Sequence, residues 1–267
     1  MPNSTRLLFI LVPVLALAAF REFRTPIVTV PNFSGHWEHA AAHFLPTDKG
    51  PGPVVNMPGL SFLAMNVWIG DYRNPILQPW ASEAVRVHAV AGLERGEPLL
   101  SQLQLCMPFG VPNILTLREP VQLLQEPGMV TILYQHDNQI RRVFLNEGHP
   151  SNLEPSPYGH SVGHYEGDTL VVDTRNMSNT GAIDFYGTPH SAALHVSERY
   201  RLLDAGRVLQ VDFTVSDLNT FTSEWHAAQR YYSIPLPRGL RENICAENIR
   251  MGVGSEYPVP TDDMLDF

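Results

Sequence analysis

The sequence predicts a mainly β fold in which an antiparallel, up-and-down meander closes into a barrel. From residue 121 onward, apolar and polar residues alternate in short runs, as they do along half-buried strands. Short turn sequences such as Pro127-Gly128 separate consecutive runs, which is typical of antiparallel neighbours. A sheet of six or more such strands tends to close on itself. The 23 prolines cluster between apolar runs, so we also expect long ordered loops around the barrel.

The N-terminus is typical of a secretory signal peptide, which we place at residues 1–19. Arg6 supplies the positive charge, residues 7–20 are apolar, and small residues at 16–19 suit a cleavage site. The apolar run is too short to span a bilayer comfortably, which favours a cleaved signal over a retained anchor. We therefore expect a secreted or periplasmic protein in which residues 20–267 form a single barrel domain.

The elements of this domain follow from local patterns. The stretch FSGHW at 33–37 resembles the start of a first strand, and the Gly- and Pro-rich stretch after it predicts irregular structure. Residues 79–95 combine good helix formers with apolar spacing and end before Gly96, which predicts one helix. The expected strands and hairpins occupy 121–135, 139–146, 161–174 and 193–215. The last 35 residues are polar and Pro-rich, and we expect a C-terminal strap over the barrel or a disordered end.

Charge and cysteine content limit the partners and the compartment. The formal net charge is -9, and the 18 Lys and Arg residues form no basic stripe, so we expect no nucleic-acid partner. After export, Cys106 and Cys245 would lie in an oxidising space. The sequence leaves two readings open, one disulfide that closes a long loop or two buried thiols.

Alternation along residues 160–166 places His160, His164 and Glu166 on one face of a strand. Two imidazoles on one face are compatible with proton transfer or with a metal site, and a solvated polar face is the alternative. His164 lies closer to the turn and is the weaker candidate.

The loop before the 193–215 hairpin carries Asp184 and His190. An aspartate beside a histidine can orient the ring and make it a general base or acid near neutral pH. The alternative is that Asp184 caps local backbone amides and His190 packs under the loop. Glu198 falls among inward-facing residues of the next strand, so it needs either a structural arginine partner or a catalytic task.

Two stretches, GHSVGHYEGDTLVVDT at 159–174 and GTPHSAALHVSERYRL at 187–202, resemble the signature of a large group of uncharacterised secreted bacterial proteins. The similarity covers roughly residues 100–250, and it implies that Asp184, His190, Glu198 and Arg199 are motif positions. Gly35-His36-Trp37 is similar to the Gly-x-Trp motif that opens lipocalin-like (calycin) barrels. This second resemblance implies a barrel with a ligand-binding mouth, although a helix at 79–95 departs from the lipocalin order.

These observations predict an exported enzyme that acts on a small, largely apolar organic molecule by acid–base chemistry, of the lyase, cyclase or isomerase type. The candidate catalytic residues are His190, Asp184, His160 and Glu198. The candidate substrate-binding residues are Trp37, Trp68, Tyr134, Trp225 and Arg199. We expect no cofactor, no metal and no stable membrane insertion after signal cleavage, and the sequence does not indicate an oligomeric state. The alternatives are a non-catalytic barrel that binds a lipophilic ligand and a metal-dependent hydrolase that uses His160 and His164.

Overall fold

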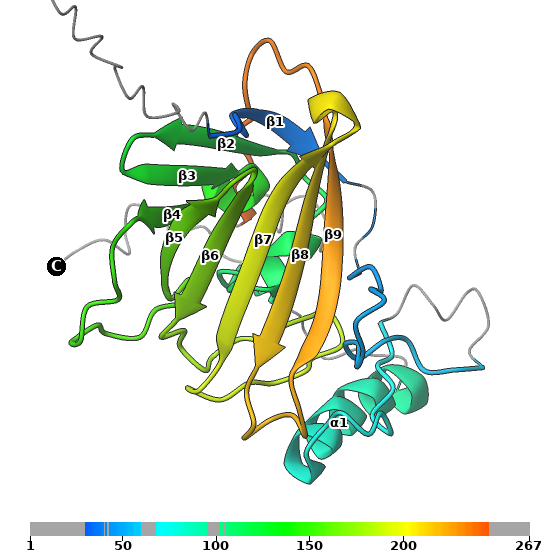
Figure 1. Ribbon diagram of the computed structural model, residues 1–267. Helices are drawn as coiled ribbons and strands as arrows, with labels where there is room; N and C mark the ends of the chain where they lie inside the picture. The colour runs from blue at the N-terminus through cyan, green and yellow to red at the C-terminus, as the bar shows by residue number, and fades with distance from the viewer. Residues whose placement is uncertain are drawn as a thin grey trace, which may run out of the picture.

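The computed structural model describes residues 30–245, except 40, 42, 60–67, 96–101 and 104, and the side chains of 92–95. The predicted signal peptide and most of the predicted C-terminal strap lie outside these residues. Nine strands close into a barrel in which each strand pairs with its neighbours in the sequence (Figure 1). The strands are β1 (Gly35–Glu38), β2 (Val121–Glu126), β3 (Met129–Tyr134), β4 (Ile140–Leu145), β5 (His160–Glu166), β6 (Thr169–Arg175), β7 (His195–Leu203), β8 (Val208–Ser216) and β9 (Trp225–Ser233).

The predicted meander is confirmed except at one pairing. β4 and β5 run parallel, with Val143 opposite Ser161 and Leu145 opposite Gly163, so the sheet is mixed rather than purely antiparallel. Parallel neighbours need a connection that returns to the starting end of the first strand, and residues 146–159 provide it. We call this segment the crossover. β1 closes the barrel against β9, with Trp37 opposite Ser233.

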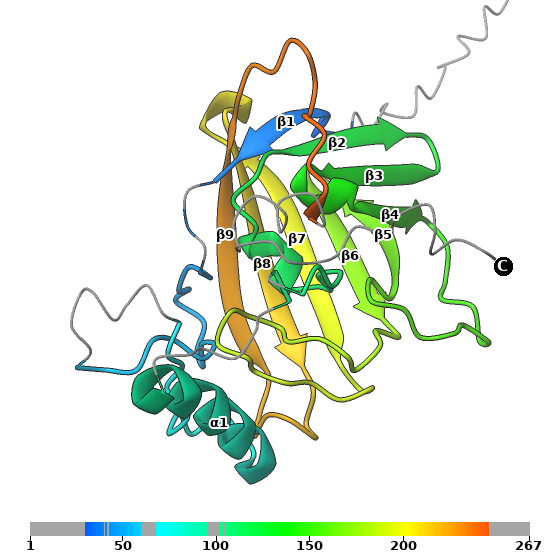
Figure 2. The ribbon, with the colours of Figure 1, turned by 180° about the vertical axis from the view of Figure 1, so that it is seen from behind.

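Protein segments fill the barrel interior. The short 3-10 helix η2 (Asn113–Thr116) lies inside the curve of the sheet (Figure 2), and all four of its residues are buried. The Leu115 carbonyl accepts hydrogen bonds from Tyr231 Oη and Gln229 Nε2, each at 3.2 Å. These bonds fix η2 to β9, so buried side chains of η2 lie inside the curve of the sheet.

The predicted helix at 79–95 is confirmed as α1 (Pro79–Arg95). Ala81, Val85 and Ala89 are buried, which is the one-face spacing of a helix that packs on a neighbour. Trp80 Nε1 donates to the Asn219 carbonyl at 2.6 Å, which ties the helix to the β8–β9 loop at one end of the barrel (Figure 1). Within the part of the chain that the structure describes, no helix combines the length and apolarity needed to cross a membrane.

Cys106 and Cys245 form a disulfide, with their Cα atoms 5.5 Å apart, which is the usual separation. The sequence left open whether the two cysteines form a disulfide or remain buried thiols, and the structure shows the disulfide. The bond closes a loop of 139 residues and ties the segment before η2 to the chain that follows β9.

Candidate functional site

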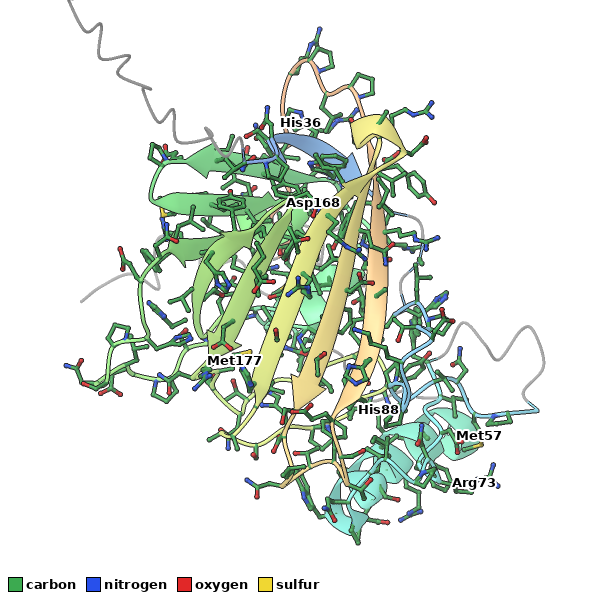
Figure 3. All side chains as sticks on the ribbon, in the orientation of Figure 1. His36, Met57, Arg73, His88, Asp168 and Met177 are labelled. Atoms are coloured by element: carbon green, nitrogen blue, oxygen red, sulfur yellow. A yellow bond between two sulfur atoms is a disulfide. The ribbon has the colours of Figure 1, made fainter. Side chains whose placement is uncertain are left out.

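The strand register gathers polar side chains on the outer face of β5, β6 and β7. His160 on β5 lies opposite Arg175 on β6, and Asp173 lies opposite Ser197 on β7. Because side chains alternate between faces, His160, Asp173, Arg175 and His195 all point away from the barrel interior. They lie at the Met177 end of β6, away from the hairpin tip at Asp168 (Figure 3).

The crossover adds His149 to this face. It leaves β4 where the Asn146 amide donates to the Gly163 carbonyl at 2.8 Å, and it pairs with the end of β6 where Ser156 bridges Met177. Gly159 ends the crossover with a φ of 62°, and a Cβ there would collide with the Arg175 carbonyl oxygen. Only glycine therefore allows the crossover to approach β6 this closely.

One carboxylate holds the resulting group together. Asp173 Oδ1 accepts from His149 Nε2 at 2.7 Å and from Arg175 Nε at 2.9 Å. Asp173 Oδ2 accepts from His195 Nε2. His149 Nδ1 lies 3.0 Å from His160 Nδ1, and the His160 ring stacks on Phe144. We call Asp173, His149, His160, Arg175 and His195 the Asp173 cluster.

The hydrogen bonds fix which ring nitrogens carry protons. A carboxylate only accepts, so His149 and His195 each carry a proton on Nε2. When His149 carries only that proton, its Nδ1 is bare and accepts the Nδ1 proton of His160. Among the described residues, His160 Nε2 and His195 Nδ1 have no hydrogen-bond partner, so each keeps a lone pair available.

The surroundings of Asp173 favour its ionised form, and the surroundings of His160 favour its neutral form. Partial burial acts to raise the pKa of Asp173, but hydrogen bonds from His195, Arg175 and His149 outweigh it and leave that pKa below its ordinary value. Partial burial, followed by repulsion from His149 when that ring is protonated, lowers the pKa of His160. Near neutral pH, Asp173 is therefore ionised and His160 is a free base.

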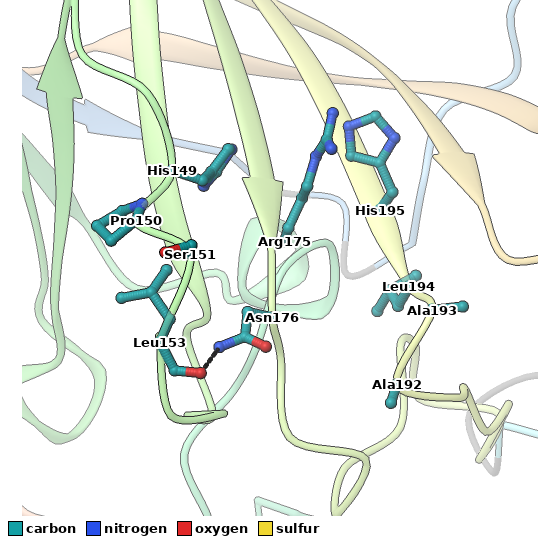
Figure 4. A pocket seen from close by; sticks show the side chains of 10 residues that line it. All are labelled: His149, Pro150, Ser151, Leu153, Arg175, Asn176, Ala192, Ala193, Leu194 and His195. Carbon is teal, nitrogen blue, oxygen red and sulfur yellow. Dashed lines mark hydrogen bonds between the residues drawn. The ribbon is translucent and has the colours of Figure 1, made fainter.

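A groove of about 470 Å³ adjoins the cluster (Figure 4). We call it the outer groove. Its lining residues are His149, Pro150, Ser151, Leu153, Arg175, Asn176, Ala192, Ala193, Leu194 and His195. The crossover forms one wall, and the segment entering β7 forms the other. Asn176 Nδ2 donates to the Leu153 carbonyl at 2.9 Å and fixes the crossover to the end of β6.

His160 is the one candidate catalytic residue that the structure places in this cluster. His164 lies four residues further along β5, is exposed, and contacts Glu166 at 3.1 Å. No group of three or more His, Cys, Asp or Glu side chains is arranged to hold a metal ion within the described residues. The described residues therefore offer no three-ligand group around His160 and His164 of the kind that the hydrolase alternative requires.

Asp184 and His190 are buried but separately bonded. Asp184 Oδ1 accepts from the amides of Tyr186 and Thr188 at 2.9 and 3.1 Å, and burial raises the pKa of this carboxyl to about 6. His190 Nδ1 donates to the Ser191 carbonyl at 3.0 Å, and burial lowers its pKa. No hydrogen bond or ion pair joins the two side chains in the described structure. Asp184 therefore caps its own loop.

Glu198 has a structural partner inside the barrel. Its carboxylate forms an ion pair with Arg141, whose side chain is 1% exposed while that of Glu198 is 0% exposed. Tyr200 Oη donates to Glu198 Oε1 at 2.7 Å, and Arg141 Nη2 donates to Thr174 Oγ1 at 2.8 Å. The network does not line the outer groove, and it gives Glu198 the structural arginine partner that the sequence left open.

The candidate substrate-binding residues do not form a barrel mouth. Trp37, Tyr134 and Trp225 are buried core residues. Trp68 stacks on Phe185 and lines a separate pocket of about 400 Å³. Arg199 points outward near the β5–β6 turn, where it pairs with Glu166 at 2.8 Å.

Sequence reasoning missed His149, Asp173 and His195. The alternation that places Glu198 inward also puts His195 on the opposite, outer face of its strand, and the same count applied to 169–175 places Asp173 outward. No sequence signal brings His149 to them, because that contact depends on the path of the crossover.

The comparisons with known proteins assign no relative. No protein-family model matches the chain, and no curated protein matches it. The candidate site therefore depends on its geometry.

Proposed function

We propose that the protein is an exported enzyme that moves protons on a small, largely apolar organic molecule, in a reaction of the lyase or isomerase (cyclase) type. The observation that carries the proposal is that each oxygen of Asp173 accepts a hydrogen bond from a different histidine Nε2 beside the outer groove. The apolar run at 7–20 and the disulfide support export.

His195 is the proposed general base. Its Nε2 proton is bonded to Asp173, so its bare Nδ1 can take a proton from a molecule bound in the groove that it lines. The positive charge that forms on the ring lies against the Asp173 carboxylate, which stabilises it. His195 can then return the proton at another position of the molecule, or the molecule can expel a leaving group.

His149 and His160 form the second acid–base branch. A proton that binds His160 Nε2 allows the shared Nδ1 proton to shift to His149, which places the charge beside Asp173. The low pKa of His160 keeps it ready to accept a proton near neutral pH. One carboxylate thus supports two bases, and a rearrangement that removes a proton at one atom and adds one at another can use both.

Deuterium uptake tests the proposal without a known substrate. The purified protein would be incubated in D₂O with a mixture of small organic molecules, and mass spectrometry would identify compounds that gain deuterium or change mass. We expect such a compound with the wild-type protein and a rate about 100-fold lower with Asp173→Asn or His195→Gln.

His164→Gln is the matched control, because His164 is an exposed histidine on the same strand face outside the cluster. This variant should keep the wild-type rate. If no compound changes, or if Asp173→Asn works at the full rate, the proposed function is wrong.

A further inference from the structure

We propose that the outer groove binds a small organic acid, with its carboxylate against Arg175 and its short apolar body against the walls. This inference deepens the proposed function and rests on it for the role of the groove. Three features of the described residues lead to it, namely the free donors of Arg175, the charge of the lining and the apolar walls.

Arg175 has unused hydrogen-bonding capacity. Its Nε donates to Asp173 Oδ1 at 2.9 Å, and in the described structure neither terminal nitrogen has a hydrogen-bond partner. The side chain is 58% exposed and lines the groove beside His195 (Figure 4). A guanidinium presents its donors in a planar fork that matches the two oxygens of a carboxylate.

The charge of the lining favours an anion. The groove contains the cation Arg175, and none of its ten lining residues is acidic, although the whole chain has a net charge of -9. Asp173 is the carboxylate nearest to Arg175 in the bonding network, and three donors already share it. A ligand carboxylate would therefore meet the unused terminal N–H groups of Arg175 without an acidic side chain in the lining to repel it.

The walls favour a short apolar body. Leu153 and Pro150 of the crossover face Ala192, Ala193 and Leu194 of the segment that enters β7. A volume of about 470 Å³ suits a molecule of modest size. A carboxylate on Arg175 also places the carbon next to the acid group close to His195, where removal of a proton would begin.

Titration with hexanoate tests the inference. Amide ¹H–¹⁵N spectra of the full protein would be recorded with increasing hexanoate, and in parallel with hexanamide and with inorganic phosphate. We expect hexanoate to shift the signals of Ala192 and Ala193 with an affinity at least tenfold higher than that of hexanamide, because only the acid pairs with Arg175.

Variants locate the interaction. Arg175→Gln should weaken hexanoate binding about tenfold, and Arg175→Lys should recover only part of it, since a lysine keeps the charge without the fork. Arg201→Gln is the control, because Arg201 is an exposed arginine on β7 outside the groove that pairs with Asp212, and it should leave hexanoate binding unchanged. The same spectra report whether each variant is folded.

The outcomes separate this inference from the proposed function. Equal binding of hexanamide, or unchanged binding by Arg175→Gln, would overturn the carboxylate site. Phosphate that binds as tightly as hexanoate would overturn the role of the apolar walls. If hexanoate binds but no compound takes up deuterium, the carboxylate site stands and the proposed enzymatic function is wrong. If a compound takes up deuterium but hexanoate does not bind, the enzymatic function stands and the carboxylate site is wrong.

Discussion

His149 and His160 meet nitrogen to nitrogen, with their Nδ1 atoms 3.0 Å apart. Only one of the two atoms can carry the proton between them, and the bond from His149 Nε2 to Asp173 decides which one does. The crossover makes this contact possible, because it returns the chain from the end of β4 to the start of β5 and carries His149 over the outer face. The parallel β4–β5 pair therefore builds the site as well as the barrel.

Replacing His149 should weaken the acid–base branch formed by His149 and His160 and leave the His195 branch intact. In His149→Gln, His195 keeps its bond to Asp173, so we expect deuterium uptake to fall less than in His195→Gln. The ratio of the two initial rates, measured on the same compound, checks this order. Equal losses in both variants would mean that the two branches do not act separately.

Breaking the buried ion pair should destabilise the barrel strongly. Glu198→Gln leaves the Arg141 charge buried without its carboxylate, and we expect a loss of about 3–5 kcal/mol in the free energy of unfolding, measured in urea. Arg199→Gln breaks an exposed pair and should cost about 1 kcal/mol or less.

A double variant distinguishes the cost of an unpaired buried charge from the contribution of the ion pair itself to the free energy of unfolding. Arg141→Met combined with Glu198→Leu removes both buried charges, so it should be more stable than Glu198→Gln alone. A double variant that is less stable than the single one would mean that the pair itself, rather than an unpaired charge, carries the stability.

Asp184 should make the protein less stable as the pH rises. Its pKa is about 6 in the folded protein against 3.8 for the unperturbed group, so between these values the folded state holds a proton that the unfolded state has released. The contribution of Asp184 to the free energy of unfolding should thus fall by about 3 kcal/mol between about pH 4 and about pH 7.

Urea unfolding of wild type and Asp184→Asn across this pH range measures that contribution, because the amide keeps an oxygen for the two backbone amides but does not titrate. Asp168→Asn, at an exposed turn, is the control and should follow the wild-type profile. A constant difference between wild type and Asp184→Asn at every pH would contradict the shift.

Removing the disulfide should lower stability through the unfolded chain. The bond closes a loop of 139 residues, and the chain-entropy estimate for such a loop is about 3–5 kcal/mol. We expect the Cys106→Ser, Cys245→Ser double variant to lose about this much in urea unfolding. A reductant should lower the stability of the wild type and leave the variant unchanged, and an effect on both would show that it acts elsewhere.

The sequence allowed the strands from β2 to β8, their turns and the single helix to be placed, because each depends on local periodicity and turn chemistry. It did not predict β9 (Trp225–Ser233). The direction of β5 could not be predicted in this way. Residues 146–159 show no hydrophobic periodicity, so the sequence does not indicate at which end of β4 the chain re-enters the sheet. The same segment determines where His149 lies. The closed barrel was therefore predicted, whereas the parallel β4–β5 pairing, the strand β9 and the site were not.

The candidate residues show the same limit. Alternation correctly placed His160 on one face with His164 and Glu166, and it placed Glu198 inward. Of the two roles left open for Glu198, the structure shows the arginine partner. Asp184 and His190 lie close in sequence, but a tight turn that Asp184 itself caps gives the two side chains separate partners. The buried aromatics fill a core that η2 completes, and no local pattern predicts a segment inside a barrel.

The most direct test of the account is the protonation of the histidine ring nitrogens. Long-range ¹H–¹⁵N spectra near neutral pH should show protons on Nε2 of His149 and His195 and on Nδ1 of His160, and the His149 pattern should change in Asp173→Asn. A bare Nε2 on His149, or spectra that Asp173→Asn leaves unchanged, would contradict an acid–base site organised by Asp173.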